Sequence, residues 1–203
     1  MIGVIDYGAG NLRSLTNALK FLEKKFRILN VPETKGISVL ILPGVGAFGS
    51  AMEKLKKRGW VDLIKEWVEN KPLLGICLGM QLFFDESEEE GTHAGLGILK
   101  GNVRKLPVKG LSLPHMGWNE VSLKRESPLL EGFPFPKYFY FAHSYCVLPE
   151  ENEVIIGETE YGVIFPSIVG RENLLGFQFH PEKSGNRGLK LIEIALKRLE
   201  ERC

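Results

Sequence analysis

Apolar runs and helix-period stretches alternate along the first half of the chain. The runs are short and bounded by turn residues, as in strands buried on both faces of a sheet, and they cover residues 2–6, 26–31, 39–42 and 73–77. The stretches between them repeat apolar residues at helical spacing and cover residues 11–25, 50–57, 61–69 and 79–84. This alternation predicts a parallel sheet with helices on both faces.

The second half has a different pattern. Strand-like runs joined by turns rich in proline and glycine cover residues 102–106, 120–123, 138–148, 154–160 and 174–179, and an amphipathic helix follows at 189–202. The acidic run from residue 85 to 95 is predicted to be a solvated loop without a function. We therefore expect one α/β domain over residues 1–203, with a mostly parallel central sheet flanked by helices and additional antiparallel strands in the second half.

Charge and composition set expectations about partners. The 203 residues carry a formal net charge of +1, with 44% apolar and 25% charged residues, which is ordinary for a globular domain. There is no basic excess typical of nucleic-acid binding, and no run approaches the ~20 apolar residues of a membrane span. The N-terminus also lacks the basic region of a signal peptide. We expect a cytoplasmic protein without nucleic-acid or membrane partners.

Cysteine and histidine spacing argues against a bound metal. The three cysteines, Cys77, Cys146 and Cys203, form no C-x-x-C pair, and their odd number disfavours a disulfide framework. The four histidines show no ligand spacing such as H-E-x-x-H. We expect neither a metal nor another cofactor.

The segment LLGICLGMQ, residues 73–81, has the pattern of a nucleophile elbow with cysteine at its apex. A buried strand ends at Cys77, Gly75 and Gly79 lie two residues to either side, and a helix follows. A sharp strand-to-helix turn of this kind exposes the side chain and requires small neighbours. A structural cysteine beside packing glycines would give the same pattern, since free cysteine is among the most buried residues.

A base for this nucleophile is available in LLGFQFHPEKS, residues 174–184. Alternation along the strand places Gln178 and His180 on the face opposite the apolar side chains. Pro181 ends the strand, and Glu182 can then reach back to the imidazole and fix its tautomer. A lone histidine is more often structural, but this corner accompanies a cysteine elbow.

The loop GVGAFG, residues 44–49, matches the dinucleotide-binding pattern G-x-G-x-x-G. A dinucleotide site also requires an acidic residue about 20 positions further on, at the end of a second strand. Here that region reads WVDLIKEWVEN and is predicted to be helical, with Asp62 inside or at the start of the helix. The backbone amides of this loop are better assigned to an oxyanion, together with the amide of Leu78 after the nucleophile.

The elbow, the PGVG loop and the HPE corner together resemble the class I, triad-type glutamine amidotransferases, and the likeness spans essentially the whole chain. The segments DYGAGN, LPHMGWNEV and YFYFAHSY are similar to the branch of this family that supplies ammonia to a separate cyclase subunit in histidine biosynthesis. The resemblance implies a heterodimer of this chain with such a cyclase. It also implies hydrolysis of L-glutamine to glutamate and ammonia through a thioester on Cys77.

The resemblance also assigns residues. Cys77 would be the nucleophile, His180 the base and acid, and Glu182 its orienting residue. Three sets of further residues follow from it: oxyanion-hole amides of Val45, Gly46 and Leu78; substrate-binding residues Gly44, Gln81, His143, Ser144 and Tyr145; and partner-face residues Asn11, His115, Trp118, Asn119 and Lys183. Core packing is an equally good interpretation of Trp118.

Three alternatives remain at this stage. The chain could be a cysteine-triad hydrolase that acts alone on γ-glutamyl or peptide bonds. It could be a nucleotide-binding module that uses residues 44–49. A non-catalytic interaction protein is least favoured, because three catalytic segments would have to coincide.

Overall fold

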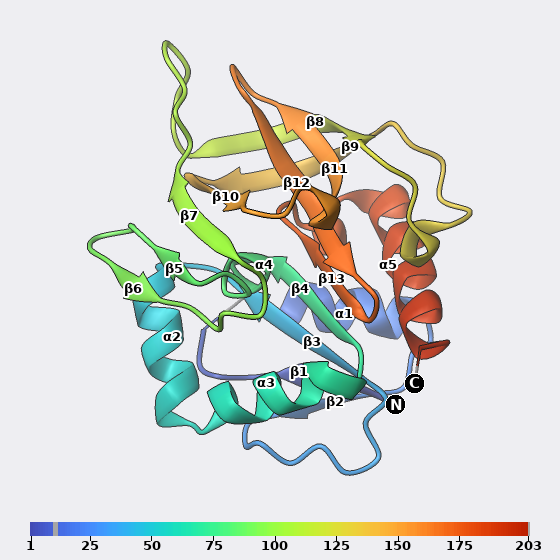
Figure 1. Ribbon diagram of the computed structural model, residues 1–203. Coiled ribbons are helices and arrows are strands. Elements are labelled where there is room, and N and C mark those ends of the chain that lie inside the picture. The colour runs from blue at the N-terminus through green and yellow to red at the C-terminus, as the bar shows by residue number, and fades with distance from the viewer. Residues whose placement is uncertain (10–11, 203) are drawn as a thin grey trace.

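The computed structural model describes residues 1–9 and 12–202 and is built on a nine-stranded sheet of order β2-β1-β3-β4-β13-β12-β11-β8-β9 (Figure 1). The first five strands of this order are parallel to one another. They are β2 (Phe26–Leu29), β1 (Ile2–Ile5), β3 (Val39–Gly44), β4 (Leu73–Cys77) and β13 (Leu174–Phe177). The predicted strands of the first half are confirmed, and β3 continues through Pro43 to Gly44, which pairs with Cys77.

The remaining four strands pair antiparallel and extend the same sheet. They are β12 (Ile164–Arg171), β11 (Ile155–Glu160), β8 (His115–Leu123) and β9 (Lys137–His143). A second sheet of order β10-β7-β5-β6 contains β10 (Tyr145–Pro149), β7 (Gly101–Lys105), β5 (Glu86–Ser87) and β6 (His93–Ala94). The mixed α/β architecture that the sequence predicts is therefore confirmed.

Two expectations for the second half were wrong. The run 138–148 is not one strand, because the chain bends at Ser144 and passes from β9 in the large sheet to β10 in the small one. The acidic run is not simply a solvated loop, because β5 and β6 lie within it and β5 pairs with β7. Strand β12 was not predicted at all.

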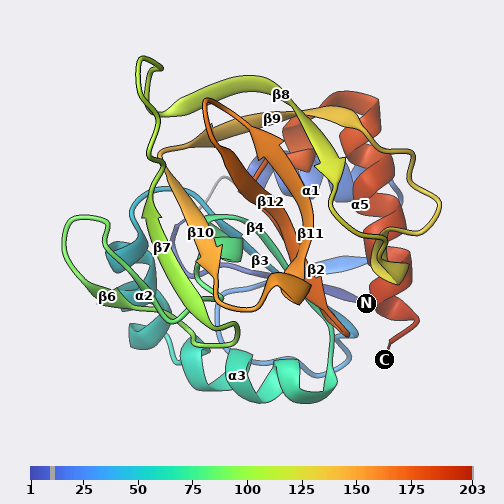
Figure 2. The same cartoon turned by 45° about the horizontal axis from the view of Figure 1, so that its top comes forward.

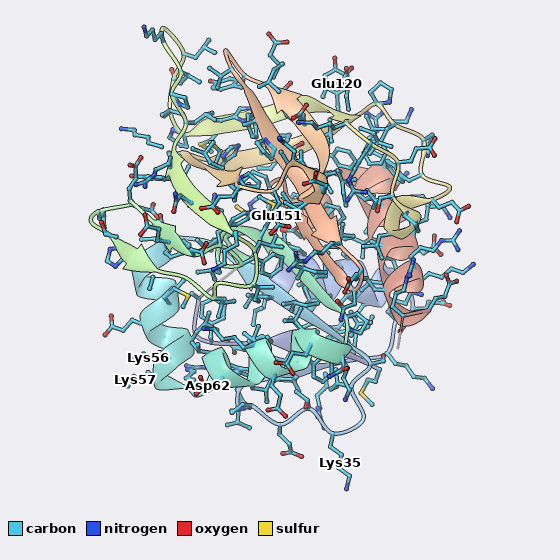
Figure 3. All side chains as sticks on the ribbon, in the orientation of Figure 1. Lys35, Lys56, Lys57, Asp62, Glu120 and Glu151 are labelled. Atoms are coloured by element: carbon cyan, nitrogen blue, oxygen red, sulfur yellow. The ribbon has the colours of Figure 1, made fainter. Side chains whose placement is uncertain are left out.

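The helices are α1 (Leu12–Phe21), α2 (Phe48–Lys57), α3 (Trp60–Asn70), α4 (Leu78–Gln81) and α5 (Gly185–Glu200), with short 3₁₀ turns η1 (Pro128–Leu130), η2 (Asn152–Val154) and η3 (Pro181–Lys183). Helix α4 is shorter than the predicted 79–84, since a turn follows Gln81. Asp62 lies in the first turn of α3 and is exposed on the outside of the molecule (Figure 3). It is not the strand-end acid that a dinucleotide site requires.

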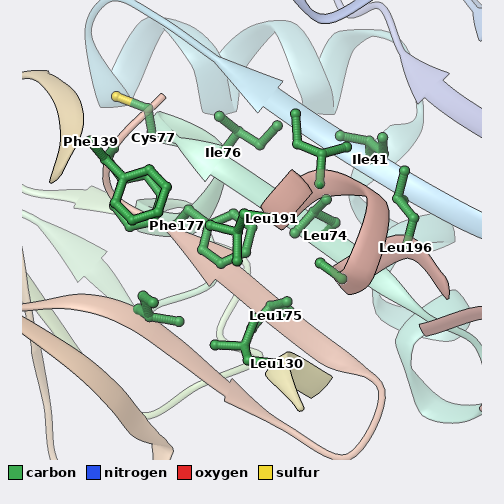
Figure 4. Close-up of a cluster of buried hydrophobic side chains, with 14 of the residues drawn as sticks. Ile41, Leu74, Ile76, Cys77, Leu130, Phe139, Leu175, Phe177, Leu191 and Leu196 are labelled. Atoms are coloured by element: carbon green, nitrogen blue, oxygen red, sulfur yellow. The ribbon is translucent and has the colours of Figure 1, made fainter. Parts of the chain in front are cut away.

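Alternate residues of the parallel strands face opposite helical layers. Val39 and Ile41 belong to the apolar cluster that includes residues of α1 and α5, part of which is drawn in Figure 4. Leu40 and Leu42 instead pack with residues of α2 and α3. Helices thus cover both faces of the parallel half (Figures 1 and 2), which explains why its strands are continuously apolar.

Candidate active site

Cys77 occupies a strained turn between β4 and α4. Its backbone has φ 54° and ψ −112°, a positive-φ conformation that side chains rarely adopt and that is concentrated at functional sites. The side chain is 5% exposed, and Figure 4 shows it past Ile76 at the margin of the apolar cluster. The turn has the strand-to-helix form of a nucleophile elbow.

Packing requires the glycines on either side of Cys77. A Cβ on Gly79 would overlap the carbonyl oxygen of Leu42 in β3, and a Cβ on Gly75 would lie 2.8 Å from the backbone nitrogen of Met80 in α4. Backbone atoms cannot move away as a flexible side chain can. The close approach of α4 to the sheet therefore depends on residues without a Cβ.

His180 and Glu182 form a buried pair beside Cys77. Nδ1 of His180 lies 2.8 Å from Oε1 of Glu182, and the two side chains are 3% and 5% exposed. Because a carboxylate only accepts, Nδ1 carries the donated proton and Nε2 is left for Cys77, with which His180 also forms a hydrogen bond. The amide of His180 donates to Tyr140 (2.8 Å), and the Ser184 hydroxyl donates to the His180 carbonyl (2.7 Å), which holds the corner in place.

The charge around His180 favours its protonated form. Burial opposes the imidazolium, but the charge of Cys77 and hydrogen bonds with Cys77 and Glu182 outweigh burial and raise the pKa of His180 to about 10. At neutral pH the histidine is therefore a cation beside the sulfur. Such a cation stabilises the thiolate, which is the nucleophilic form of cysteine.

A cavity of about 180 Å³ opens at Cys77. Its size suits a ligand smaller than the drug-sized molecules that occupy pockets of roughly 300–1,000 Å³. Its lining combines Cys77 and His180 with most of the predicted oxyanion and substrate residues: Val45, Gly46, Cys77, Leu78, Gln81, Glu89, Ala142, His143, Ser144, Tyr145, His180 and Lys183.

Gly44, which was predicted to bind substrate, is not one of the residues that line this cavity. It pairs with Cys77 across β3 and β4, and a Cβ there would lie 2.8 Å from the Cβ of Leu78 and 2.9 Å from the hydroxyl of Tyr7. Gly44 therefore allows the elbow to pack against β3. Gly46, in contrast, has φ 100° and no atom near its Cβ direction, so its glycine serves the backbone conformation of the loop.

Gln178 was noted in the sequence without a role, and the structure places it next to the nucleophile. It is fully buried, and its Nε2 donates to Cys77 Sγ at 3.8 Å. Its Oε1 accepts from Nε2 of Gln81 (3.0 Å), which also donates to the Tyr145 carbonyl (2.9 Å). Gln178 therefore helps to orient Gln81 in the cavity.

Glu89 is a further residue that the sequence did not reveal. It belongs to the acidic run, yet it lines the cavity and its Oε2 accepts from the amide of Phe48 at the start of α2 (2.7 Å). The N-cap residue of α2 is Ala47, which has no capping side chain. The absence of a capping side chain at the start of α2 is the sequence signal that could have indicated a carboxylate from elsewhere in the chain. Together with Lys183, Glu89 gives the cavity both signs of charge.

The predicted partner-face residues fall into three groups. Trp118 is 55% exposed, so core packing is the wrong interpretation, and it lines a separate groove of about 720 Å³ together with Asn119. Lys183 lies over the ring of Tyr140 (5.9 Å to the centroid), which contacts Trp118. His115 also lines this groove, but it is only 2% exposed. Asn11 lies outside the described residues.

The comparisons with known proteins agree with this geometry. The family model for class I glutamine amidotransferases matches residues 3–197, and the chain belongs to that family. It is 51% identical over 195 residues to the imidazole glycerol phosphate synthase subunit HisH of Desulfitobacterium hafniense (strain DSM 10664 / DCB-2), covering 95% of this chain and 92% of that one. It is also 51% identical over 194 residues to the protein of that name from Methanocaldococcus jannaschii, covering 95% and 97%.

Solved structures show the same fold. A structure described as PurLQS from Thermotoga maritima superposes with a TM-score of 0.77, covering 98% of both chains at 19% identity. At that identity the likeness concerns the fold alone. In the part of the chain that the structure describes, no helix has the length and apolar character needed to cross a membrane.

Proposed function

We propose that this chain is the glutaminase subunit of imidazole glycerol phosphate synthase: it hydrolyses L-glutamine and delivers the ammonia to a cyclase subunit in histidine biosynthesis. The observation that carries the proposal is the strained Cys77 at the base of an amino-acid-sized cavity, hydrogen-bonded to His180, which in turn pairs with Glu182. The identity of about 50% to HisH subunits over 95% of the chain supports this particular member of the family.

Acylation begins with the Cys77 thiolate attacking the side-chain carboxamide carbon of glutamine. The negative oxygen of the tetrahedral intermediate is stabilised by backbone amides, for which we assign Leu78 and the Val45–Gly46 segment. Protonated His180 then gives its proton to the departing nitrogen, so that the C–N bond breaks and ammonia leaves. A glutamyl thioester remains on Cys77.

In deacylation His180 acts first as a base, whereas in acylation it acts as an acid. Neutral His180 takes a proton from water as the oxygen attacks the thioester carbon. Collapse of the second tetrahedral intermediate breaks the C–S bond, releases glutamate and regenerates the thiolate beside protonated His180. Glu182 keeps the ring in one tautomer and stabilises its charge throughout.

Substrate recognition follows from the charges around the cavity. Glutamine brings an α-ammonium and an α-carboxylate, and we assign the ammonium to Glu89, whose carboxylate lies in the lining. The side-chain amide of Gln81 and the backbone of His143, Ser144 and Tyr145 complete the amino-acid end of the site. A cavity with these groups selects a zwitterion over a bare amide.

The partner follows from the chemistry of ammonia. Ammonia that reaches bulk water becomes ammonium and is no longer a nucleophile, so it has to pass to its acceptor in a closed complex. We assign the docking face to the groove beside Trp118 and Asn119, where exposed apolar side chains gather: Leu111, Met116, Trp118, Tyr138 and Ile164. The occupant is the cyclase subunit, in a heterodimer.

The nucleophile assignment is tested with an electrophilic chloroketone analogue of glutamine and mass spectrometry. We expect one covalent adduct, on the peptide that contains Cys77, and protection by excess glutamine. Cys146 is a built-in control, because burial raises the pKa of its thiol to about 12 and leaves it unreactive. Labelling of Cys146 with Cys77 unmodified would refute the assignment.

A lone hydrolase is distinguished by the rate without a partner. We expect slow glutamine hydrolysis by the isolated chain and faster hydrolysis once the cyclase subunit and its ligand are added. Equal rates in both conditions would contradict the partner-dependent function and favour an enzyme that acts alone.

A further inference from the structure

Two buried histidines lie between the partner groove and the glutamine cavity and take no part in the chemistry above. His115 on β8 and His143 on β9 are 2% and 6% exposed and face each other in register. Nδ1 of His115 is 3.1 Å from Nε2 of His143. Burial is the main cause that lowers the pKa of His115 to about 4 and that of His143 to about 3, so both rings are neutral at neutral pH.

The neighbours of the pair fix the tautomer of each ring. Nδ1 of His143 lies 2.8 Å from the carbonyl oxygen of Tyr145. Because a carbonyl only accepts, His143 carries its proton on Nδ1 and its Nε2 is an acceptor. His115 must then donate from Nδ1 to that Nε2, which leaves the Nε2 of His115 as an acceptor.

Asn119 completes the arrangement at the groove. Its Oδ1 accepts from the amide of Glu120 (2.8 Å), which fixes the orientation of the carboxamide. Its Nδ2 donates to the carbonyl of Glu160 (2.8 Å) and lies 3.4 Å from Nε2 of His115. The amide donor of Asn119 therefore faces Nε2 of His115, the ring nitrogen that is left as a hydrogen-bond acceptor.

At the other end, the chain of hydrogen bonds reaches the nucleophile. The Tyr145 carbonyl accepts from both His143 and Nε2 of Gln81, so both of its lone pairs are used. Gln81 in turn donates to Gln178, and Gln178 to Cys77. In each of these hydrogen bonds, from Asn119 to Gln178, a group that can donate faces a group that can accept.

Aromatic rings hold His115 in place. Its ring stacks between Tyr161 (centroids 4.0 Å apart) and Phe141 (4.8 Å). A ring clamped on both faces keeps its nitrogens in the plane of the hydrogen bonds to Asn119 and His143. The stack alone would be satisfied by phenylalanine, whereas the bonds require histidine.

We propose that His115 and His143 are positioning residues that hold the Tyr145 carbonyl, and through it Gln81, in the orientation that binds glutamine. Because His115 lies on β8, the strand beneath the partner groove, the pair also connects the orientation of Gln81 to that strand. The proposal rests on the glutaminase function given above, since it assigns the pair to that substrate site.

Two variants of His115 separate positioning from packing. His115→Phe keeps the stack but removes the donor to His143, whereas His115→Asn loses the stack but places an amide N–H near the position of Nδ1. Positioning predicts that His115→Phe raises the KM for glutamine roughly tenfold, as for one lost buried hydrogen bond, with kcat within about twofold. His115→Asn should lie within about threefold of the wild-type KM. Packing alone predicts the opposite order, and that order would overturn the proposal.

The control is Ser167→Ala, which removes a buried hydrogen bond from Thr159 (2.9 Å) in the same sheet, outside this chain of bonds. It should lower stability and leave the KM for glutamine within about twofold. The assay is glutamine hydrolysis by the complex with the cyclase subunit. No hydrolysis by the wild-type complex would refute the proposed function itself, whereas hydrolysis with an unaltered KM in His115→Phe would refute only the positioning role.

A measurement on the unmodified protein avoids any dependence on variants that fold poorly. Nitrogen NMR of histidine side chains in the ¹⁵N-labelled complex reports which ring nitrogen carries the proton. We expect both His115 and His143 to be neutral with the proton on Nδ1. A proton on Nε2 of His143 would break the chain of donors and overturn the proposal.

Discussion

Replacing Glu89 by glutamine tests how the cavity recognises its substrate. The carboxylate lines the cavity and accepts from the amide of Phe48 at 2.7 Å, so it is held in place by the start of α2. Glutamine keeps an acceptor for this amide but loses the charge. The loss at the helix N-terminus should lower the free energy of unfolding by about 1 kcal/mol or less.

The effect on substrate binding should be larger. A hydrogen bond to a charged partner contributes about 1.5–3 kcal/mol, which corresponds to a rise in KM for glutamine of roughly 10- to 100-fold. Steady-state hydrolysis by the complex gives the KM, and urea unfolding gives the stability. Glu90→Gln is the matched control, because Glu90 is the next residue and is exposed. A KM within about twofold of wild type in Glu89→Gln would refute the assignment of the ammonium to this carboxylate.

Three further predictions follow from the geometry. Gly79→Ala should destabilise the fold by about 2–4 kcal/mol, because its Cβ would overlap the Leu42 carbonyl; a change under ~1 kcal/mol in urea unfolding would contradict this. Trp118→Ala should weaken cyclase binding by about 2 kcal/mol in calorimetry with unfolding unchanged, and unchanged affinity would remove Trp118 from the interface. His180 has a raised pKa, so its contribution to stability is fully present below about pH 6.5 and is lost as the pH rises through about 10. The difference in unfolding free energy between wild type and His180→Gln should therefore shrink from pH 7 to pH 10, and a constant difference would contradict the ion pair.

The elbow and the HPE corner were accessible from sequence because their signals are local. A buried strand that ends at Cys77 between two glycines specifies the turn almost without reference to the rest of the fold. The same holds for His180, where Pro181 ends the alternation and Glu182 follows within reach. They meet in space because β4 and β13 are parallel neighbours, so the ends of both strands lie at the same edge of the sheet.

Other features depend on contacts between distant segments and left little trace in the sequence. Nothing local marks Ser144 as the point where the chain changes sheets, since the apolar run continues on both sides. Glu89 reaches the cavity only because the small sheet folds its loop against α2. Strand β12 contains Pro166, which argues against a central strand. The register shift of β11 opposite this region accommodates a residue without an N–H.

His115 illustrates a different limit. Its segment was predicted to lie at the partner face, and Trp118 in the same strand β8 is indeed exposed, whereas His115 is buried. Alternation along a strand places neighbouring side chains on opposite faces, but the sequence does not say which of the two faces is covered. The covering residues come from other segments, among them Phe141 in β9 and Tyr161 in the turn between β11 and β12.

The central claim is that Cys77 makes ammonia for a second active site, and the most direct measurement compares two nitrogen sources. Synthesis by the complex of Cys77→Ala with the cyclase subunit is followed with glutamine and, separately, with an ammonium salt at alkaline pH. We predict that glutamine-dependent synthesis falls by at least ~10³-fold while ammonia-dependent synthesis stays close to wild type. Substantial synthesis from glutamine by the variant would contradict the role of Cys77, and synthesis from ammonia that is equally lost would contradict the division of labour between the two subunits.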